Sequence, residues 1–260
     1  MIDRARVVIK RMRWHIWLAC SLLWVSTLSA ERLTIVYGDY PPFYMGVEPD
    51  GKTQVTQGML IDFLKEFSRQ HPEYTFNHIC LPRRRMDAAM LSGEAQVFSL
   101  NNPMFVKEDR ERFLWTIPIW HTRDVVVTLK GKEFKFDKPE DLFGKTLGRL
   151  FGNGYGEYDR LFAEGRIKVE DAKTTKALAE MALAGRTDGF LGNTHATPYQ
   201  LKQAGLSPAR FTFSAKPIFA FDLMMQINEN HPAFLEKMNA FITRSKRNGF
   251  LKRIEDNYLK

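Results

Sequence analysis

Cysteine is scarce in this sequence. Only Cys20 and Cys80 occur among its 260 residues, and Cys20 lies in an N-terminal segment that we expect to be removed. One remaining cysteine cannot form an internal disulfide, so the fold must be stabilised by its hydrophobic core even in an oxidising compartment. We therefore predict that Cys80 is a small, buried, apolar side chain.

Long apolar runs are missing as well. After residue 30 no segment has as many as about eighteen consecutive apolar residues, which argues against a membrane-spanning helix in the mature chain. Residues 1–30 have the parts of an export signal, with a basic start, an apolar stretch at 16–25 and small residues before Glu31. The apolar stretch is only about ten residues long, too short to cross a bilayer. We predict a signal peptide at 1–30 and a periplasmic mature protein.

Two other fates of this N-terminal segment stay open. Leu28 fits poorly three positions before the predicted cut, which leaves an uncleaved anchor as one alternative. Cys20 follows Leu18 and Ala19 as in a lipoprotein signal, although Trp17 stands where a branched aliphatic residue is expected.

No strong excess of one charge sign marks the mature chain. The net charge is +8, and residues 1–30 carry about half of that excess. A mild positive excess is compatible with an anionic solute or an anionic membrane surface and establishes neither. The basic residues are scattered, so we expect no nucleic-acid partner.

The sequence also lacks the usual signatures of metal sites and hydrolases. Its six histidines show no HExxH or other metal-ligand spacing. Ser99 and Ser214 have no nucleophile-elbow context. Asp39 or Glu157 could act only as a lone acid, which is weak evidence for catalysis. We expect no enzyme activity, no metal and no cofactor.

A regular alternation of strand and helix patterns is present instead. The first cycle has strands at 33–37, 74–79 and 95–100, separated by helices at 56–70 and 83–92. This βαβαβ order predicts a mostly parallel sheet with helices on both faces.

A second cycle follows the β-branched strand at 124–129. Its patterns are a helical turn and strand within 140–150, helix 155–163, strand 166–169, helix 173–184, strand 188–191, helix 195–203, strand 210–213, strand 218–227, and helices 232–247 and 249–258.

The doubled order predicts an α/β protein with two lobes, each a mostly parallel sheet flanked by helices. Extended segments near 121–125 and 218–223 would connect the lobes. We expect 31–121 with 222–260 to form lobe 1 and 122–221 to form lobe 2. Small molecules bind outside the carboxyl ends of such strands, so the cleft between the lobes is the expected site.

A rigid aromatic loop, YGDYPPFY at 37–44, follows the first strand. Its two prolines end the strand and stiffen the loop. Tyr40, Phe43 and Tyr44 would then form one wall of the cleft, the alternative being that these rings pack over the edge of the core.

The order of these signals is similar to that of a known family. The segments that carry the likeness are YPPFY, GMLIDFLKEF, RRRMDAAMLSGEAQV, EDLFGKTLGRLFGNGYG, ALAGRTDGFLGN and RNGFLKRIEDNYL. From 31 to 260 the chain resembles the family 3 extracellular solute-binding proteins, the polar-amino-acid receptors of bacterial ABC importers. The resemblance implies the type II periplasmic-binding-protein fold, which closes around one solute by hinge bending and presents it to a permease in the inner membrane.

The resemblance transfers the ligand-binding residues incompletely. An arginine that grips the solute carboxylate would be Arg110, in a loop longer than is usual, with Arg112 as the alternative; the charge-alternating segment also reads as exposed surface. The position of the family's ammonium-binding aspartate is Asn193, and its lobe 1 aspartate is Gln96. Either another acid substitutes, with Asp39 and Glu157 as candidates, or the solute lacks a free α-ammonium.

Other polar groups are expected to line the same cleft. Ser99 and Asn101 end the third strand and can supply hydrogen bonds. The backbone N–H groups around Asn153 and Gly154 precede a helix and can face an anion, although a tight turn also explains these glycines. Arg83 follows Pro82 at a helix start and can turn into the cleft or stay solvated.

We therefore expect a monomeric receptor for a small polar solute, an amino acid or a related organic anion, that delivers it to an ABC importer. A periplasmic sensing subunit for a membrane signalling protein is the first alternative. An enzyme derived from this fold is the second.

Overall fold

The computed structural model describes residues 30–38, 40–45, 56–106 and 109–259. The predicted signal peptide lies outside this range except for Ala30, and so does Asp39. The signal peptide therefore stays a prediction.

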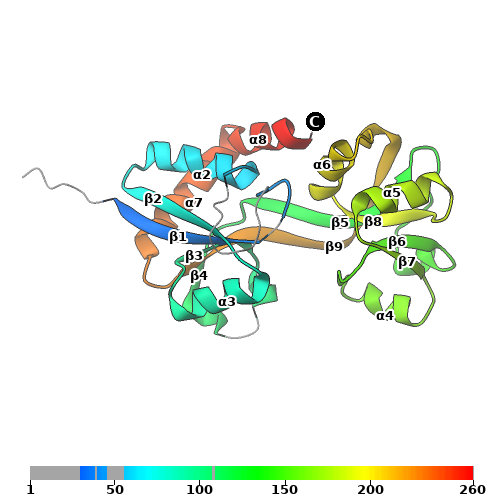
Figure 1. Ribbon diagram of the computed structural model, residues 1–260, viewed down its shortest axis with the longest axis horizontal. Coiled ribbons are helices and arrows are strands. Elements are labelled where there is room, and N and C mark those ends of the chain that lie inside the picture. The colour runs from blue at the N-terminus through cyan, green and yellow to red at the C-terminus, as the bar shows by residue number, and fades with distance from the viewer. Residues whose placement is uncertain (1–29, 39, 46–55, 107–108, 260) are drawn as a thin grey trace, which may run out of the picture.

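The elements form two groups that are connected by two long strands (Figure 1). The first group, lobe 1, contains β1 (Glu31–Tyr37), α2 (Met59–Gln70), β2 (Tyr74–Cys80), α3 (Arg83–Ser92), β3 (Val97–Asn101), β4 (Phe113–Trp115), α7 (Pro232–Arg247) and α8 (Phe250–Leu259). The second group, lobe 2, contains β6 (Thr146–Leu150), α4 (Tyr158–Ala163), β7 (Lys168–Ala172), α5 (Thr175–Leu183), β8 (Gly189–Asn193) and α6 (Ala196–Gln203). The connecting strands are β5 (Trp120–Leu129) and β9 (Phe211–Asn228). Single 3-10 turns occur at η1 (Pro103–Phe105), η2 (Arg110–Arg112), η3 (Pro139–Leu142) and η4 (Pro208–Arg210).

The predicted order of strands and helices is confirmed, with two differences. Residues 211–228 form one continuous strand instead of two, since β9 runs through both lobes. The short strand β4 was not predicted; its three residues pair with the lobe 1 end of β9, and so short a segment has no periodicity of its own.

The sheet is mixed rather than mostly parallel. Its strand order is β2-β1-β3-β9-β5-β8-β6-β7, with β4 also paired to β9. The β1–β2, β1–β3, β6–β7 and β6–β8 pairs are parallel, but β9 runs antiparallel to β3, β4 and β5, and β5 runs antiparallel to β8. The reason is the path of the chain, which returns from lobe 2 to lobe 1 directly through β9, without the crossover that a parallel pair requires.

The predicted division of the chain places its boundaries at 121/122 and 221/222, inside β5 and β9. Both strands continue without a break across these positions, so no structural boundary between the lobes lies at either of them. The division stays a prediction.

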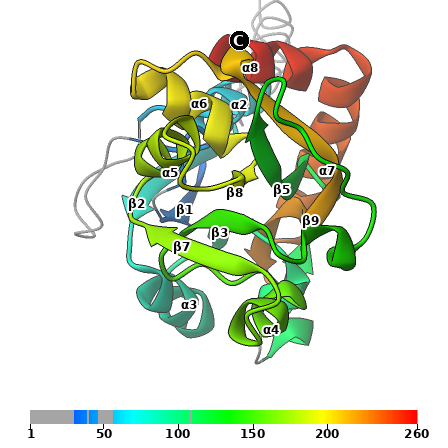
Figure 2. The ribbon, with the colours of Figure 1, turned by 90° about the vertical axis from the view of Figure 1, so that its right-hand side faces the viewer.

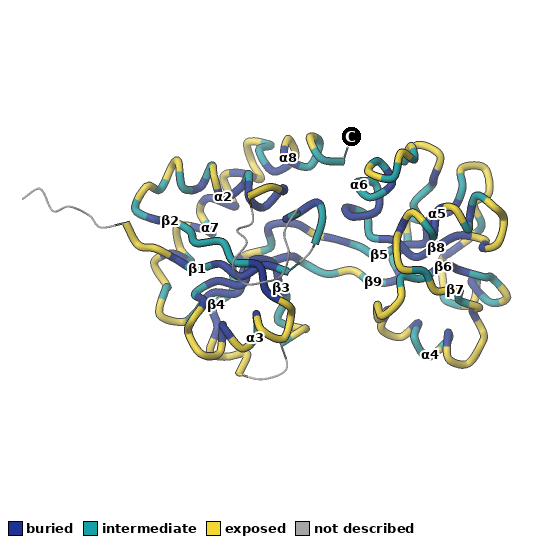
Figure 3. Tube along the Cα trace, in the orientation of Figure 1, coloured by how far each residue is buried: buried dark blue, intermediate teal, exposed yellow. Residues whose placement is uncertain are grey.

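Helices cover both faces of the sheet in each lobe (Figures 1 and 2). Successive residues of a strand point to opposite faces, and the cores follow this rule. In β1, Leu33 and Ile35 join the cluster that contains α2, α7 and α8, whereas Val36 joins the cluster beneath α3. In β5, Val126 joins one core cluster of lobe 2, whereas Val125 and Val127 join the cluster on the opposite face of the sheet. β1 and β5 therefore have stretches that are buried on both faces, whereas every residue of β7 is at least partly exposed; the trace in Figure 3 is coloured by this burial.

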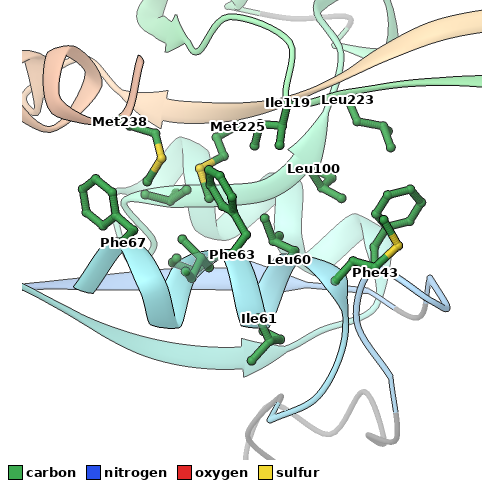
Figure 4. Close-up of a cluster of buried hydrophobic side chains, with 14 of the residues drawn as sticks. Phe43, Leu60, Ile61, Phe63, Phe67, Leu100, Ile119, Leu223, Met225 and Met238 are labelled. Atoms are coloured by element: carbon green, nitrogen blue, oxygen red, sulfur yellow. The ribbon is translucent and has the colours of Figure 1, made fainter. Parts of the chain in front are cut away.

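The largest core lies between β1, β3, β9 and α2. Phe63 and Phe67 of α2 point into it together with Met225 and Met238 (Figure 4). Cys80 is fully buried, as predicted, and its Sγ lies 3.6 Å from the carbonyl oxygen of Gly38.

Candidate functional site

Two adjoining cavities lie at the junction of the lobes. The lobe 1 cavity has a volume of about 440 Å³ and is bordered by Arg83, Phe98 and Asn101 among others. The lobe 2 cavity, also about 440 Å³, is bordered mainly by the middle of β5, the ends of β6 and β8 and the first turns of α5 and α6. Tyr40 and Phe221 line both cavities. The two cavities therefore form one cleft between the lobes.

The aromatic loop contributes to this cleft unequally. Tyr40 is partly buried and lines both cavities. Phe43 is fully buried and packs on Trp120, with ring centroids 5.3 Å apart. Tyr44 borders the lobe 1 cavity but is only 4% exposed and packs edge-on against Tyr37. Of the three rings, Tyr40 has the position that a cleft wall requires, while Phe43 is a core residue.

The same loop also caps α2. The carbonyl oxygens of Pro42 and Phe43 accept hydrogen bonds from the N–H groups of Met59 and Leu60, at 2.9 and 3.0 Å. These N–H groups have no partner within their own helix. Gly58 allows this contact, because a Cβ there would lie 2.3 Å from the Phe43 carbonyl oxygen. The loop therefore ends β1 and also caps the first turn of α2.

The lobe 2 cavity contains a carboxylate, that of Asp124. Its Oδ1 accepts a hydrogen bond of 2.9 Å from Nδ2 of Asn193, the residue that pairs with it between β5 and β8. Burial raises the pKa of the Asp124 carboxyl, and the bond from Asn193 opposes that rise. Burial also raises the pKa of Tyr40 and, to about 12, that of Tyr155, with the nearby Asp124 charge adding to both shifts.

Asn193 has a structural task besides this bond. Its Oδ1 accepts from the backbone N–H groups of His195 and Ala196, at 3.0 and 3.1 Å, where α6 begins. Its Nδ2 also lies 2.9 Å from the Thr122 hydroxyl, which interacts with the side chain of Tyr40. A chain of polar contacts thus joins the Tyr40 wall to the start of α6.

Asp124 was missed in the sequence. The only local signal is a charged residue at the head of the apolar run DVVVTL, and its place opposite Asn193 depends on pairing between strands far apart in the chain. Of the two acids that the sequence offers as substitutes, Glu157 is exposed and borders neither cavity, and Asp39 lies outside the described residues. Lobe 2 therefore has an acid in the cleft, although not at position 193.

The glycine-rich turn after β6 brings Asn153 to the lobe 2 cavity. Gly152 and Gly156 adopt positive φ, which supports the tight-turn interpretation of these glycines. The N–H of Tyr155 donates to the Asp159 carboxylate at 2.9 Å, so this donor is already used within the turn. Gly154 is exposed beside it and does not line the cavity.

On the lobe 1 side, Arg83 borders the cavity with its guanidinium over the ring of Phe98, 4.8 Å from the centroid. Its Nε also donates to Asp87 at 3.2 Å. Asn101 lines the same cavity and donates through Nδ2 to Gln226 at 2.8 Å. Ser99 is fully buried, lines neither cavity, and has no hydrogen-bond partner for its hydroxyl among the residues described.

Arg110 is not brought into the cleft. It lies exposed in η2 and borders neither cavity, and the alternative Arg112 pairs with Asp109 at 3.2 Å on the surface. Gln96 stands at the other end of β3, where its side chain binds the N–H of Thr34 and the carbonyl oxygen of Gly93. Arg83 is the only one of the three predicted arginines that borders the cleft.

The described part of the chain contains no group of three or more His, Cys, Asp or Glu side chains placed to hold a metal ion. None of its helices has the length and apolar character that crossing a membrane requires.

Comparisons with known proteins agree with this architecture. Residues 33–260 match the model of the bacterial extracellular solute-binding proteins, family 3, while no curated protein sequence matches the chain. A polar amino acid ABC uptake transporter substrate-binding protein from Streptococcus thermophilus is 17% identical, covering 91% of this chain and 89% of that one, with a TM-score of 0.69.

Two further structures show the same fold. Substrate-binding domain 2 of GlnP from Lactococcus lactis, in its open conformation, is 20% identical over 88% of this chain and 95% of that chain, with a TM-score of 0.66. A probable amino-acid ABC transporter extracellular-binding protein from Bacillus subtilis is 15% identical over 88% and 98%, also with a TM-score of 0.66. The family model covers most of the chain, and the two-lobed fold is the one that these structures share. The chain belongs to the bacterial extracellular solute-binding proteins of family 3.

Proposed function

We propose that this protein is a periplasmic receptor that captures a small polar solute, an amino acid or a close relative, and delivers it to an ABC importer. The observation that carries the proposal is the cleft. Tyr40 and Phe221 border both of its cavities, and polar side chains line it from each lobe. A solute held there contacts both lobes at once.

Contact with both lobes is what makes such a protein a receptor that responds to its ligand. Two strands, β5 and β9, connect the lobes, so a bending motion of these strands can change the width of the cleft. A ligand shifts the balance between open and closed forms only as far as it binds one of them better. A solute that touches both walls meets this condition, because it gains its second set of contacts on closure.

The relatives support an amino acid as the class of solute. The compared proteins from Streptococcus thermophilus and Bacillus subtilis are named as components of amino acid transporters. The volume of each cavity, about 440 Å³, lies within the range of small-molecule sites.

A thermal-shift screen tests the proposal directly. The mature chain is heated with each of the amino acids, with organic acids and with polyamines, and a bound solute raises the melting temperature at concentrations above its dissociation constant. A hit is then measured by calorimetry. Its uptake is followed in cells that carry or lack the gene, and we expect the loss of uptake to be restored by the gene.

Two outcomes would contradict the proposal. If no polar solute stabilises the protein, it is not a receptor of this kind. If a solute binds tightly but its uptake does not depend on the gene, delivery to an importer is wrong and the sensing alternative takes its place.

A further inference from the structure

The carboxylate of Asp124 lies in the cleft, where it borders the lobe 2 cavity, and no positively charged side chain among the described residues forms an ion pair with it. The neighbouring Arg123 is directed elsewhere, since its guanidinium donates to the carbonyl oxygen of Ala215 at 3.0 Å. A carboxylate removed from water without a counter-charge costs free energy.

This carboxylate is held in a fixed direction. Asn193 donates to Oδ1 of Asp124, and Asn193 is itself fixed by the two backbone N–H groups at the start of α6. The two residues are also paired in register between β5 and β8. These contacts fix the position of the Asp124 carboxylate relative to the start of α6 and so define where a positively charged group would bind.

Aromatic rings surround the same position. Tyr40, Tyr155 and Phe221 border the lobe 2 cavity, and the charge of Asp124 is close enough to raise the pKa of both phenols. Ring faces attract cations and repel anions. The surroundings of Asp124 therefore favour a positively charged group over a negatively charged one.

We propose that Asp124 is the counter-charge for a cationic nitrogen of the solute, an ammonium or a guanidinium group, and that Asn193 is the residue that positions it. This inference rests on the proposed function. The positively charged group of the solute would bind to Asp124 in the connecting strand β5 and not to Asn193 at the end of β8. This placement also removes the reason to expect a solute without an ammonium group, because that expectation assumed that lobe 2 has no acid in the cleft.

The test compares matched solutes on matched proteins. For each solute found in the screen, an analogue is prepared in which hydrogen or hydroxyl replaces the amine. Calorimetry then measures the affinity of the solute and of its analogue for wild type, Asp124→Asn and Glu157→Gln. We expect Asp124→Asn to weaken binding of the amine by at least about 30-fold, the scale for a lost buried charge partner. Binding of the amine-free analogue should change little. Glu157→Gln removes an exposed acid of the same lobe and should leave both affinities unchanged.

The melting temperature of the unliganded variant shows whether it has folded. Because the pKa of Asp124 is raised by burial, its ionised form destabilises the folded state at neutral pH. Asp124→Asn should therefore melt at the same temperature as wild type or higher, while it loses the amine. If Asp124 served only to stabilise the fold, Asp124→Asn would instead lower the melting temperature.

Asn193→Ser tests the positioning role. Serine keeps a hydroxyl that can cap α6 but lacks the amide that donates to Asp124, so the pKa of Asp124 should rise further. The midpoint of the pH profile of amine binding should then move to higher pH. The titratable side chains that the Asp124 charge affects are Tyr40 and Tyr155, and His195 lies one contact further away, 3.2 Å from the Thr122 hydroxyl. The same shift should be absent from the profile of the amine-free analogue.

Three results would overturn the inference. If wild type binds amine and amine-free solutes equally, or if Asp124→Asn weakens both equally, the inference is wrong while the proposed function stands. If wild type binds no solute at all, the proposed function fails and the inference fails with it.

Discussion

The rings of one short loop show how differently neighbouring residues can be used. Tyr40 and Phe43 look alike in the sequence, since both follow the first strand beside two prolines. In the structure their rings lie 4.9 Å apart, centroid to centroid, yet Tyr40 borders the cleft and Phe43 is fully buried. Sequence predicts the loop and its stiffness, but which ring faces the cleft depends on Trp120, a residue far away in the chain.

Alanine substitutions separate these two roles. Phe43→Ala should lower the free energy of unfolding by about 3–5 kcal/mol, because it leaves a cavity in the core. Tyr40→Ala should destabilise less and should weaken solute binding by about 1–3 kcal/mol. Chemical denaturation and calorimetry measure the two effects. If Tyr40→Ala costs as much stability as Phe43→Ala and leaves affinity unchanged, Tyr40 is a core residue as well.

His78 gives the stability of lobe 1 a pH dependence. Burial, with the charge of Lys65 as a smaller cause, lowers the pKa of the His78 imidazole to about 4. Its Nδ1 lies 2.8 Å from the hydroxyl of Tyr37. Between pH 6.5 and 4 the unfolded chain binds a proton at this residue that the folded chain does not, so stability present above pH 6.5 is lost as the pH falls.

The loss over that range should be about 2–3 kcal/mol for this one group. Urea denaturation of wild type and His78→Gln at pH 7 and pH 5 measures it. We expect the variant to lose less stability than wild type between the two conditions. An equal loss in both proteins would mean that other groups cause the acid sensitivity.

At the scale of elements, the start of α2 depends on one glycine. The helix was predicted from residue 56 and begins at Met59, because Gly58 has a φ of 128° and turns the chain toward the aromatic loop. Periodicity finds the body of a helix, but its first residue is decided by contacts with another segment. In the same way, local patterns predict the order of elements, while the continuity of β9 and the pairing of Asp124 with Asn193 arise only in the folded sheet.

Gly58→Ala should therefore be strongly destabilising. The new Cβ would meet the backbone of Phe43 at 2.3 Å, and backbone cannot move aside as a flexible side chain can. We expect a loss of about 3 kcal/mol or more in the free energy of unfolding. Gly93→Ala is the matched control, since Gly93 also has positive φ but a Cβ added there would meet nothing within 4 Å; it should cost only about 1–2 kcal/mol.

From the sequence alone, the substitution Asn193→Asp would restore the charge that the family has at this position, but the structure predicts a different effect. It would place an oxygen of a second carboxylate where Nδ2 of Asn193 now lies, 2.9 Å from Oδ1 of Asp124. Two carboxylates at this distance cannot both ionise easily, so the pKa of the pair should rise. The variant should be less stable than wild type at pH 7 and should recover part of the difference toward pH 5, as the folded pair takes up a proton.

The double variant with Asp124→Asn and Asn193→Asp is the control for that effect. It exchanges the two groups and keeps a single carboxylate, so its stability at pH 7 should exceed that of Asn193→Asp alone. Thermal melts at both pH values measure the difference. If the single and double variants melt together at pH 7, repulsion between the carboxylates is not the cause of the loss.

For the whole molecule, the important feature is how the described residues join the two lobes. β5 and β9 pair along most of their length, and the start of α6 contacts lobe 1. There, the ring of His195 lies 5.3 Å from that of Phe43, centroid to centroid, and its Nε2 lies 3.8 Å from Glu255 of α8. The cleft-lining groups Tyr40 and Asp124 lie beside this junction, so a bound solute acts where the lobes meet.

Solute binding should therefore make the molecule more compact, and each wall should be necessary for that change. Small-angle X-ray scattering with and without a saturating solute measures the radius of gyration. We expect a decrease for wild type. Tyr40→Ala and Asp124→Asn should give a smaller decrease or none, even at solute concentrations that fill the site, because a ligand that has lost its contacts with one wall no longer favours the closed form over the open one. If both variants close as fully as wild type when saturated, the free energy of closure comes from contacts other than those of Tyr40 and Asp124. If wild type binds its solute with no change in radius, the two lobes do not move on binding, and the hinge role of β5 and β9 is wrong.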